Sequence, residues 1–360
     1  MINKDRLIDT LCDLIKIDSP SGEENRIGQY LIKYLAKLDI KADFDDYGNV
    51  IGKSKTGNGK SVLLSAHMDT VEPSRGITPK IDGPHLVSDG TTILGGDCKA
   101  GIASILEAIE SLKEDAAQHI SFEIAFTRQE EIGLVGARNL DYSNLTSKEA
   151  IVFDGEGPVT QLTSSSPTHV GFEIIIKGKA AHAGVEPENG ISAIKIASEL
   201  ITLLPQGRID EETTFNIGVM DGGSVTNAVP ENAIIKGEFR SHNDATLNGI
   251  KDVLQSAVTQ VGNSFPEAII NINQSTHFER YNLNGEEASL KRVVNAFKIL
   301  GLEYELKPSG GGTDANIFIA HGIDSAIVGM ADHNAHTVRE YVVINELLDV
   351  AKVCDQILRT

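Results

Sequence analysis

The sequence predicts an α/β protein in which a mainly parallel sheet is interrupted by a smaller inserted domain. Three observations carry this prediction. The first part of the chain alternates helical and strand patterns, which is typical of a parallel sheet covered by helices. The middle of the chain has a different order of elements, β-α-β-β-α-β. The length of 360 residues is long for one compact core and natural for two domains.

The α/β part of the chain supplies its helices and strands in alternation. Ser21, with Glu24 three residues later, fits a capping box at the start of a helix. Apolar residues at helical spacing predict helices at 7–15, 27–38 and 99–115. Continuous or alternating apolar runs predict strands at 62–66, 120–126, 150–153 and 325–330.

The inserted part is predicted to form a compact two-layer unit of the ferredoxin-like kind. Its predicted strands are 171–177, 213–219, 233–239 and 268–273, and its predicted helices are 191–204 and 245–261. We therefore expect residues 166–277 to form a smaller inserted domain. Residues 1–165 and 278–360 would form the α/β domain.

The charge and the cysteine content narrow the possible partners and the compartment. Asp and Glu total 51 and Lys and Arg total 32, which gives a formal net charge of −19. A surface this acidic repels phosphate backbones and anionic lipids, so we expect neither nucleic acid nor membrane as a partner. The first 20 residues lack the apolar core of a signal peptide, and three cysteines form no disulfide framework. These features favour a soluble, cytoplasmic protein.

Polar residues follow the predicted strands at the points where those strands end. In an open α/β sheet, ligand sites form outside the carboxyl ends of the strands. Carboxylates repel one another at such an edge unless a cation is present, and a dinuclear metal centre explains their gathering. Imidazole and carboxylate ligands suit Zn²⁺, with Co²⁺ or Mn²⁺ as alternatives. The segments are His67 with Asp69, Asp97 before a helix, Glu130 with Glu131, Asp154, and Asp332 to His336.

Each of these residues alone has an ordinary structural explanation. A lone His67 is more often a hydrogen-bonded core histidine than a ligand, and Asp97 before a helix is usually an N-cap. Asp154 near two glycines is usually a turn residue. Because five separate segments carry such residues at predicted strand or helix ends, a metal site is favoured over five unrelated structural roles. The stretch TGNGKS (56–61) is not a phosphate loop, because Ser54 stands where such a loop needs glycine, and we expect a turn there.

Beyond this pattern, the sequence resembles the dinuclear-zinc peptidases of the family that includes peptidase T, glutamate carboxypeptidase and acetylornithine deacetylase. The resemblance is strongest to peptidase T-like, tripeptide aminopeptidase-like members. It extends along nearly the whole chain, in the order in which the motifs occur in the family. The matching stretches are SAHMDTV (65–71), DGTTILGGDCKAGIA (89–103), TRQEEIGLVGA (127–137), IVFDGEG (151–157), GKAAHAG (178–184), GGSVTNAVPENA (222–233), GGGTDAN (310–316) and HNAHTVREY (333–341).

The resemblance implies a role for each motif residue. It implies that Asp97 bridges two metal ions and that Glu130 is the general base acting on a metal-bridged water. Asp69 matches the residue that orients His67. His333 also lies near the last motif, but His336 is chosen because Glu340 and Tyr341 follow it as in the family. The implied metal ligands are His67, Asp97, Glu131, Asp154 and His336.

The resemblance also implies a function for each domain. Residues 166–277 would form a lid and dimerisation domain that contacts substrate, and residues 1–165 and 278–360 would form the catalytic, metal-binding domain. His182 matches a histidine that reaches across a dimer to the oxygen of the scissile carbonyl, although it could instead act within its own chain. Asn227 and Arg240 match groups that hold the substrate carboxylate. Backbone N–H groups of the loop containing Gly311 and Gly312 are further candidates. Cys98 departs from the Asp or Met of many relatives, and its role stays open.

The expected function is metal-dependent hydrolysis of an amide bond in short peptides by a homodimer, as in an aminopeptidase that acts on tripeptides. The alternative is an N-acyl-amino-acid deacylase or a carboxypeptidase on the same scaffold. A third hypothesis is a metal-binding protein without catalysis. Glu130 argues against that hypothesis, because a purely structural site needs no free base beside its ligand.

Overall fold

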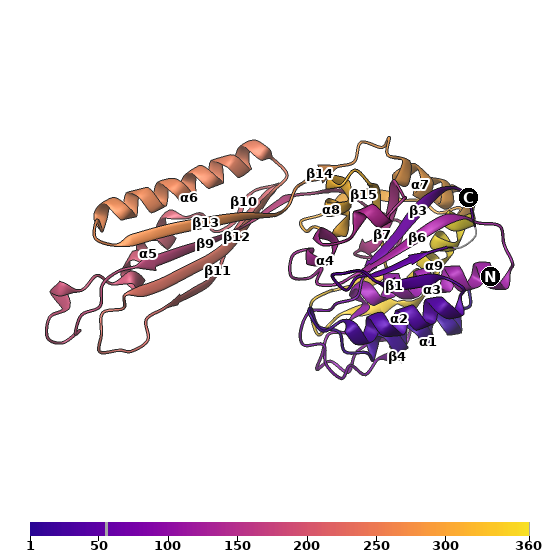
Figure 1. Cartoon of the computed structure of the whole chain (residues 1–360), viewed down its shortest axis with the longest axis horizontal. Helices are drawn as coiled ribbons and strands as arrows, with labels where there is room; N and C mark the ends of the chain where they lie inside the picture. Colours follow the sequence, from indigo (N-terminus) through magenta and orange to yellow (C-terminus); the bar gives the residue numbers. More distant parts are fainter. Residues whose placement is uncertain (55–56, 360) are drawn as a thin grey trace. The chain divides into compact units, whose positions relative to one another are not determined.

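A computed structural model describes residues 1–54 and 57–359, which form two compact units (Figure 1). The first unit comprises Met1–Ser165, Asn282–Ser309 and Thr313–Thr360. The inserted unit comprises Ser166–Tyr281 and Gly310–Gly312. The sequence prediction placed the insertion at 166–277, and the structure also assigns 278–281 and a short glycine segment to the inserted unit.

The first unit is built on a sheet whose central strands β6, β3, β7 and β16 run parallel to one another. The strand order is β1-β2-β6-β3-β7-β16-β8-β14, with β15 beside β8. Antiparallel pairs flank the parallel centre, so the predicted mainly parallel α/β fold is confirmed. The strands are β1 (Lys41–Phe44), β2 (Val50–Lys53), β3 (Asn58–His67), β6 (Ile120–Thr127), β7 (Glu149–Gly155), β8 (Gln161–Ser166), β14 (Tyr281–Asn282), β15 (Glu305–Pro308) and β16 (Asp324–Gly329).

The helices of the first unit bury their apolar stripes in one continuous core. Helix α3 is buried along most of its length and packs against α1, α9, β3 and β7. The helices are α1 (Lys4–Ile15), α2 (Asn25–Lys37), α3 (Gly96–Glu114), α4 (Val135–Arg138), α7 (Ala288–Leu300), α8 (Asp314–Ala320) and α9 (Ile344–Arg359), with a 3₁₀ turn at Tyr142–Asn144. No helix in the described ranges is long and apolar enough to cross a membrane.

The expected capping box at Ser21 and Glu24 is wrong. Helix α2 has no side-chain cap at its first turn. The Glu24 carboxylate instead accepts from the N–H groups of Gly22 (2.7 Å) and Gln129 (3.1 Å). The Ser21 hydroxyl donates to Asp69 (2.7 Å). Contacts with two distant loops therefore replace the local cap, and a local sequence pattern cannot reveal them.

A second, smaller sheet in the first unit brings two C-terminal segments together. Its strands are short and follow the order β17-β18-β5-β4. Because β17 and β18 pair, the loop between them is closed at its base and carries His336. The strands are β4 (Lys80–Asp82), β5 (His85–Val87), β17 (Asp332–His333) and β18 (Tyr341–Val343).

The inserted unit is a five-stranded antiparallel sheet with α5 and α6 packed against it and against each other (Figure 1). The strand order is β10-β11-β12-β9-β13, which contains the predicted β-α-β-β-α-β unit plus β10. The sequence analysis missed β10 because all four of its residues are exposed and show no apolar alternation. The elements are β9 (Thr168–Lys177), a 3₁₀ turn (Pro187–Asn189), α5 (Ala193–Leu203), β10 (Gly207–Asp210), β11 (Thr213–Gly222), β12 (Asn232–Ser241), α6 (Asp244–Ser264) and β13 (Ile269–Phe278).

We predict that Gly101→Ala destabilises the protein by about 1–3 kcal/mol, the usual effect of overpacking a core. A Cβ at Gly101 would lie 2.3 Å from the carbonyl oxygen of Phe153, so α3 would have to move away from β7. Gly249→Ala in α6 is the matched control, because a Cβ there meets nothing within 4 Å. That change should stabilise the helix by about 0.5–1 kcal/mol. Denaturant unfolding measures both changes, and equal effects of the two variants would contradict the close packing of α3 on β7.

Candidate metal centre

The predicted site residues of the first unit come from segments that meet at one edge of the parallel sheet. Strand β3 ends at His67, β6 ends three residues before Glu130, and Asp154 lies near the end of β7. Asp97 lies in the first turn of α3. The loop between β17 and β18 carries His336. Parallel strands place their carboxyl ends at the same edge, so segments far apart in sequence deliver their polar groups together.

Asp97 lies between two groups of potential metal ligands. In the first group, potential ligand atoms of His67, Asp97, Cys98 and Asp154 all lie within 4.8 Å of one another. In the second group, those of Asp97, Glu131 and His336 do so. One Asp97 oxygen is 2.9 Å from His67 Nε2, and its other oxygen is 3.2 Å from His336 Nε2. A carboxylate held between two such groups has the position that a bridging ligand requires.

The remaining ligand atoms complete each group. His67 Nε2 lies 3.4 Å from Asp154 Oδ1, and His336 Nε2 lies 3.0 Å from Glu131 Oε2. Imidazole nitrogens and carboxylate oxygens in this number are the donor set of a dinuclear Zn²⁺, Co²⁺ or Mn²⁺ site. The residues present therefore fit two divalent ions.

Asp69 contacts the ends of two strands, through His67 at the end of β3 and through the loop that follows β6. The Nδ1 atom of His67 lies 2.9 Å from the Asp69 carbonyl oxygen and 3.5 Å from its carboxylate. The carboxylate also accepts from the backbone N–H groups of Glu130 (3.0 Å) and Glu131 (3.3 Å). A carboxylate beside the second nitrogen of an imidazole leaves Nε2 available as a ligand. Asp69 thus contacts both the His67 ring and the backbone of the loop that carries both glutamates.

Burial of several carboxylates makes this edge of the sheet electrostatically unfavourable without cations. Burial, reinforced by the charge of Asp97, raises the pKa of Glu131 to about 7. Burial also raises the pKa of Asp154. Asp97 is the exception: burial favours its neutral form, but hydrogen bonds with His336 and His67 outweigh burial and lower its pKa. Divalent ions would replace protons at these groups and remove the repulsion.

The adjacent Glu130 and Glu131 have different environments. Glu131 contacts His336, whereas the Glu130 carboxylate accepts no hydrogen bond from any residue in the described ranges. Glu130 is only 9% exposed, and burial followed by the charge of Asp154 raises its pKa well above the usual value. One glutamate is therefore engaged with the metal-ligand group, while its neighbour keeps its oxygens available.

The backbone around the centre contains two positions in the left-handed region. Gln129 has φ 54° directly before Glu130, and His336 has φ 62°. Residues other than glycine adopt this backbone region at some cost in energy, and such residues cluster at functional sites. The contacts of Gln129 with Glu24 and of His336 with Asp97 help to hold them there.

Cys98 and His333 lie near the ligands but have other partners. The Cys98 thiol donates to the Phe153 carbonyl oxygen (2.7 Å), and burial raises its pKa well above the usual value. A neutral thiol engaged in this way is a poor metal ligand. His333 Nε2 lies 2.7 Å from a carboxylate oxygen of Glu346, and its ring stacks on Tyr341. His333 belongs to neither ligand group in the described ranges.

The other predicted site residues lie in the inserted unit. His182 and Asn227 are exposed neighbours, because Ala183 N–H donates to the Asn227 carbonyl (3.0 Å) and His182 forms a bridge with Ala228. Arg240 on β12 pairs with Glu238 (3.1 Å) and donates to the Gly310 carbonyl (3.2 Å).

The glycine segment is held within the same unit. The Gly311 carbonyl accepts from Ser166 (2.8 Å). Gly312 packs so closely on Phe278 that a Cβ there would lie 2.3 Å from the ring. A hydrogen bond therefore holds Gly311 in place, and close packing on Phe278 explains why residue 312 is glycine.

Sequence reasoning missed three polar residues that surround the ligands. Ser21 donates to Asp69, and Asp314 accepts from the Thr127 hydroxyl. Glu340 accepts from three backbone N–H groups beside Asp97. Asp314 and Glu340 belong to motifs that carry the resemblance, which was the signal available for them. Ser21 had no such signal.

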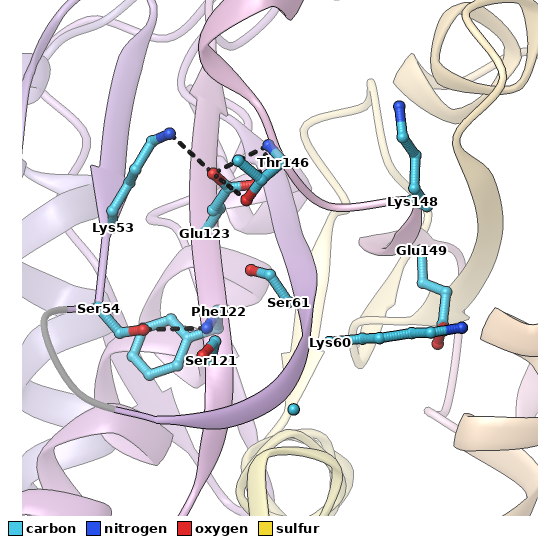
Figure 2. A pocket seen from close by; sticks show the side chains of 11 residues that line it. Lys53, Ser54, Lys60, Ser61, Ser121, Phe122, Glu123, Thr146, Lys148 and Glu149 are labelled. Carbon is cyan, nitrogen blue, oxygen red and sulfur yellow. Dashed lines mark hydrogen bonds and ion pairs between the residues drawn. The ribbon is translucent and has the colours of Figure 1, made fainter.

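A cavity of about 560 Å³ lies away from this centre, at the amino ends of β3, β6 and β7 (Figure 2). Gly59, Lys60 and Ser61 line this cavity, and they lie in strand β3 instead of the expected turn. Thr56 of that expected turn lies outside the described residues. Glu123 at the cavity pairs with Lys53 (2.9 Å) and accepts from Thr146 (2.9 Å), so these groups neutralise each other locally. The cavity is not part of the candidate metal centre.

Comparisons with known proteins match two peptidase family models to this chain. A family model described as peptidase dimerisation domain matches residues 165–265, and one described as peptidase family M28 matches residues 49–159. The chain is 36% identical to the uncharacterised protein YqjE of Bacillus subtilis, over 98% of this chain and 97% of that protein.

Two solved structures are similar over nearly their whole length. The aminopeptidase PepT from Bacillus cereus is 34% identical with a TM-score of 0.86, covering 99% of this chain and 98% of that one. A tripeptidase from Staphylococcus aureus is 31% identical with a TM-score of 0.90, covering 100% and 98%.

We predict that the metal-free protein loses stability as the pH rises from about 5 to about 9. The pKa of Glu131 is raised from 4.5 to about 7 in the folded protein. Its contribution to the free energy of unfolding is therefore fully present below pH 4.5 and is lost as the pH rises through 7. His336, beside Asp97 and Glu131, has its pKa raised from 6.5 to about 10, so its contribution is present below 6.5 and is lost as the pH rises through 10. Both groups therefore make the folded metal-free protein less stable as the pH rises.

Thermal unfolding after treatment with a chelator measures this effect. The Tm of the metal-free protein should fall with pH, and its distance below the Tm of the zinc-loaded protein should widen. Glu131→Gln should reduce the slope, because it removes one of the two groups. A Tm that stays level or rises over this range in the metal-free wild type would show that the ligand carboxylates are not crowded as described.

Proposed function

The chain belongs to the peptidase T family of metallopeptidases, and from this premise we propose that it is a dinuclear metal-dependent aminopeptidase that acts on short peptides. The observation that carries the proposal is Asp97, whose two oxygens face His67 and His336 in two separate ligand groups. The proposed ligands of one ion are His67 and Asp154, those of the other are Glu131 and His336, and Asp97 serves both.

Zinc is the proposed metal, because the donor set combines imidazole and carboxylate without an available thiolate. Cobalt and manganese accept the same donors and remain outcomes of metal analysis. When bound, two divalent ions polarise a carbonyl oxygen and lower the pKa of water, which is the chemistry needed for amide hydrolysis. A cytoplasmic location stays a prediction from the sequence.

Glu130 is the proposed general base. Its carboxylate is buried beside the ligand groups and is not engaged by any described neighbour, so it can accept a proton from water. Burial raises its pKa, which allows it to hold that proton until the leaving amine requires it. Asp69 fixes the backbone N–H of Glu130 and so holds this base beside the ligands.

Substrate contacts are proposed for exposed groups of the inserted unit. The pairing between the segments around His182 and Asn227 supports a joint role for these side chains at one place. His182 would donate to the oxygen of the scissile carbonyl. Arg240 would bind the substrate carboxylate, which would compete with Glu238 for its guanidinium. Backbone N–H groups at Gly311 and Gly312 would add further contacts.

A homodimer formed through the inserted unit is proposed from the matched dimerisation model and from the edge of its sheet. Strand β10 pairs with β11 only as far as Phe215, so the rest of β11 forms an edge within the described part of the sheet. Val219 and Met220 on this segment are 48% and 41% exposed. An exposed edge strand with apolar side chains is suited to pairing with a second copy.

We predict that the zinc-reconstituted protein releases free N-terminal amino acids from a library of short peptides. Glu130→Gln should lower turnover by at least ~10² while the metal stays bound, because it removes only the proton acceptor. Glu131→Gln is the matched control, because it should lose metal as well as activity. Mass spectrometry of the products and metal analysis of each variant give both readouts.

Other products would overturn the assignment in defined ways. Release of an acyl group or of a C-terminal residue would make the protein a deacylase or carboxypeptidase. Bound metal without turnover of peptides or N-acyl amino acids would make it a binding protein. Near wild-type activity of Glu130→Gln would exclude Glu130 as the base.

We predict that His182 of one chain completes the site of the other chain. The test mixes a His182→Ala chain with a Glu130→Gln chain, each nearly inactive alone. Only a mixed dimer combines an intact Glu130 with an intact His182 from its partner. Random pairing of equal amounts makes half of the dimers mixed, each with one good site, so activity should recover to about a quarter of wild type. No recovery, once mixed dimers are detected, would place His182 in its own chain's site or outside catalysis.

A further inference from the structure

The carboxylate of Glu340 binds the backbone of the segment that carries Asp97. One of its oxygens accepts from the N–H groups of Leu94 (2.8 Å) and Gly95 (2.9 Å). Its other oxygen accepts from the N–H of Asp97 (3.1 Å). Glu340 is 2% exposed, so water does not compete for these bonds. Charge-assisted bonds to three N–H groups fix the path of the chain into Asp97.

Glu340 also belongs to the loop that carries His336. Its own N–H donates to the Thr337 carbonyl oxygen (3.0 Å), which closes the turn that follows His336. Strand β18 begins at the next residue and pairs with β17 and β5. One side chain therefore joins the loop of His336 to the segment of Asp97, which is about 240 residues away in sequence.

Asp332 lies beside Glu340 on the same face of Gly96. A Cβ placed on Gly96 would lie 2.5 Å from Asp332 Oδ1 and 3.2 Å from Glu340 Oε1, so both carboxyl groups fill the space that a side chain would need. Asp332 is fully buried, and neither of its oxygens accepts a hydrogen bond from the described residues. Burial, followed by the charge of Glu340, raises the pKa of Asp332 well above its usual value. Asp332 therefore fills the space beside the Glu340 carboxylate and limits its movement.

We propose that Glu340, supported by Asp332, is a positioning residue that sets the backbone of residues 94–97 so that the two oxygens of Asp97 reach both ligand groups. The inference rests on the proposed function, in which Asp97 bridges two ions. Neither Glu340 nor Asp332 belongs to a ligand group in the described ranges, so both act through Asp97. Partners behind the ligands commonly change metal affinity by 10–100-fold when they are altered.

The test measures zinc affinity by competition with a chelator, together with the Tm of the metal-free protein. Glu340→Gln should weaken zinc binding by about 10–100-fold, because its amide nitrogen cannot accept from the N–H of Asp97. Asp332→Asn should bind zinc within about threefold of wild type, because asparagine has nearly the same size and fills the same space beside Glu340 and Gly96. Glu346→Gln is the matched control, since Glu346 contacts His333 and not the Asp97 segment.

The outcomes separate positioning from a merely structural role. If Glu340→Gln lowers the Tm of the metal-free protein but binds zinc with wild-type affinity, Glu340 only stabilises the fold and the proposal is wrong. If Glu340→Gln does not fold, Glu340→Asp is measured, whose shorter side chain cannot reach all three N–H groups and should show the same loss of affinity. Equal loss in Asp332→Asn would contradict a supporting role in which Asp332 only fills the space beside Glu340. A wild-type protein that binds no metal would instead refute the proposed function.

Discussion

Repulsion among buried carboxylates is the constraint on which the rest of the structure depends. Asp97, Glu130, Glu131 and Asp154 approach one another at one edge of the parallel sheet, where little water screens them. Burial and neighbouring charges raise the pKa of three of these groups, whereas two histidines keep Asp97 ionised. Such an arrangement is stable only with protons or cations, and its donor geometry suits two divalent ions.

The fold holds these groups together by binding backbone N–H groups with further buried carboxylates. Asp69 holds the loop of Glu130 and Glu131, and Glu340 holds the segment of Asp97. The sheet brings the proposed ligands to one edge, and these two acids bind the backbone that carries Asp97, Glu130 and Glu131. In the proposed function, catalytic geometry would therefore depend on residues that do not themselves bind metal, a common property of metal sites.

The sequence predicted the four parallel central strands, helices α1, α2 and α3, and the polar residues at the strand ends, because apolar periodicity and strand length are local properties of the chain. It did not define helices α7 and α9 or the outer strands of the sheet. It could not predict β10, whose residues are all exposed, or the true partners of Ser21 and Glu24, which bond to distant loops instead of capping a helix. The bonds of Glu340 were equally invisible, since they join residues about 240 positions apart. Proposed roles for His182, Asn227 and Arg240 came from resemblance, because no local pattern distinguishes them from exposed polar residues.

The central claim is that Asp97 bridges two metal ions, and anomalous X-ray scattering from crystals of the zinc-loaded protein tests it most directly. Data collected on both sides of the zinc absorption edge should give two peaks per chain, about 3.5–4 Å apart, as in other two-metal sites. Each peak should lie about 2.0–2.2 Å from a different oxygen of Asp97, one on the side of His67 and one on the side of His336. A single peak, or two peaks of which either lies beyond bonding distance of Asp97, would contradict the account.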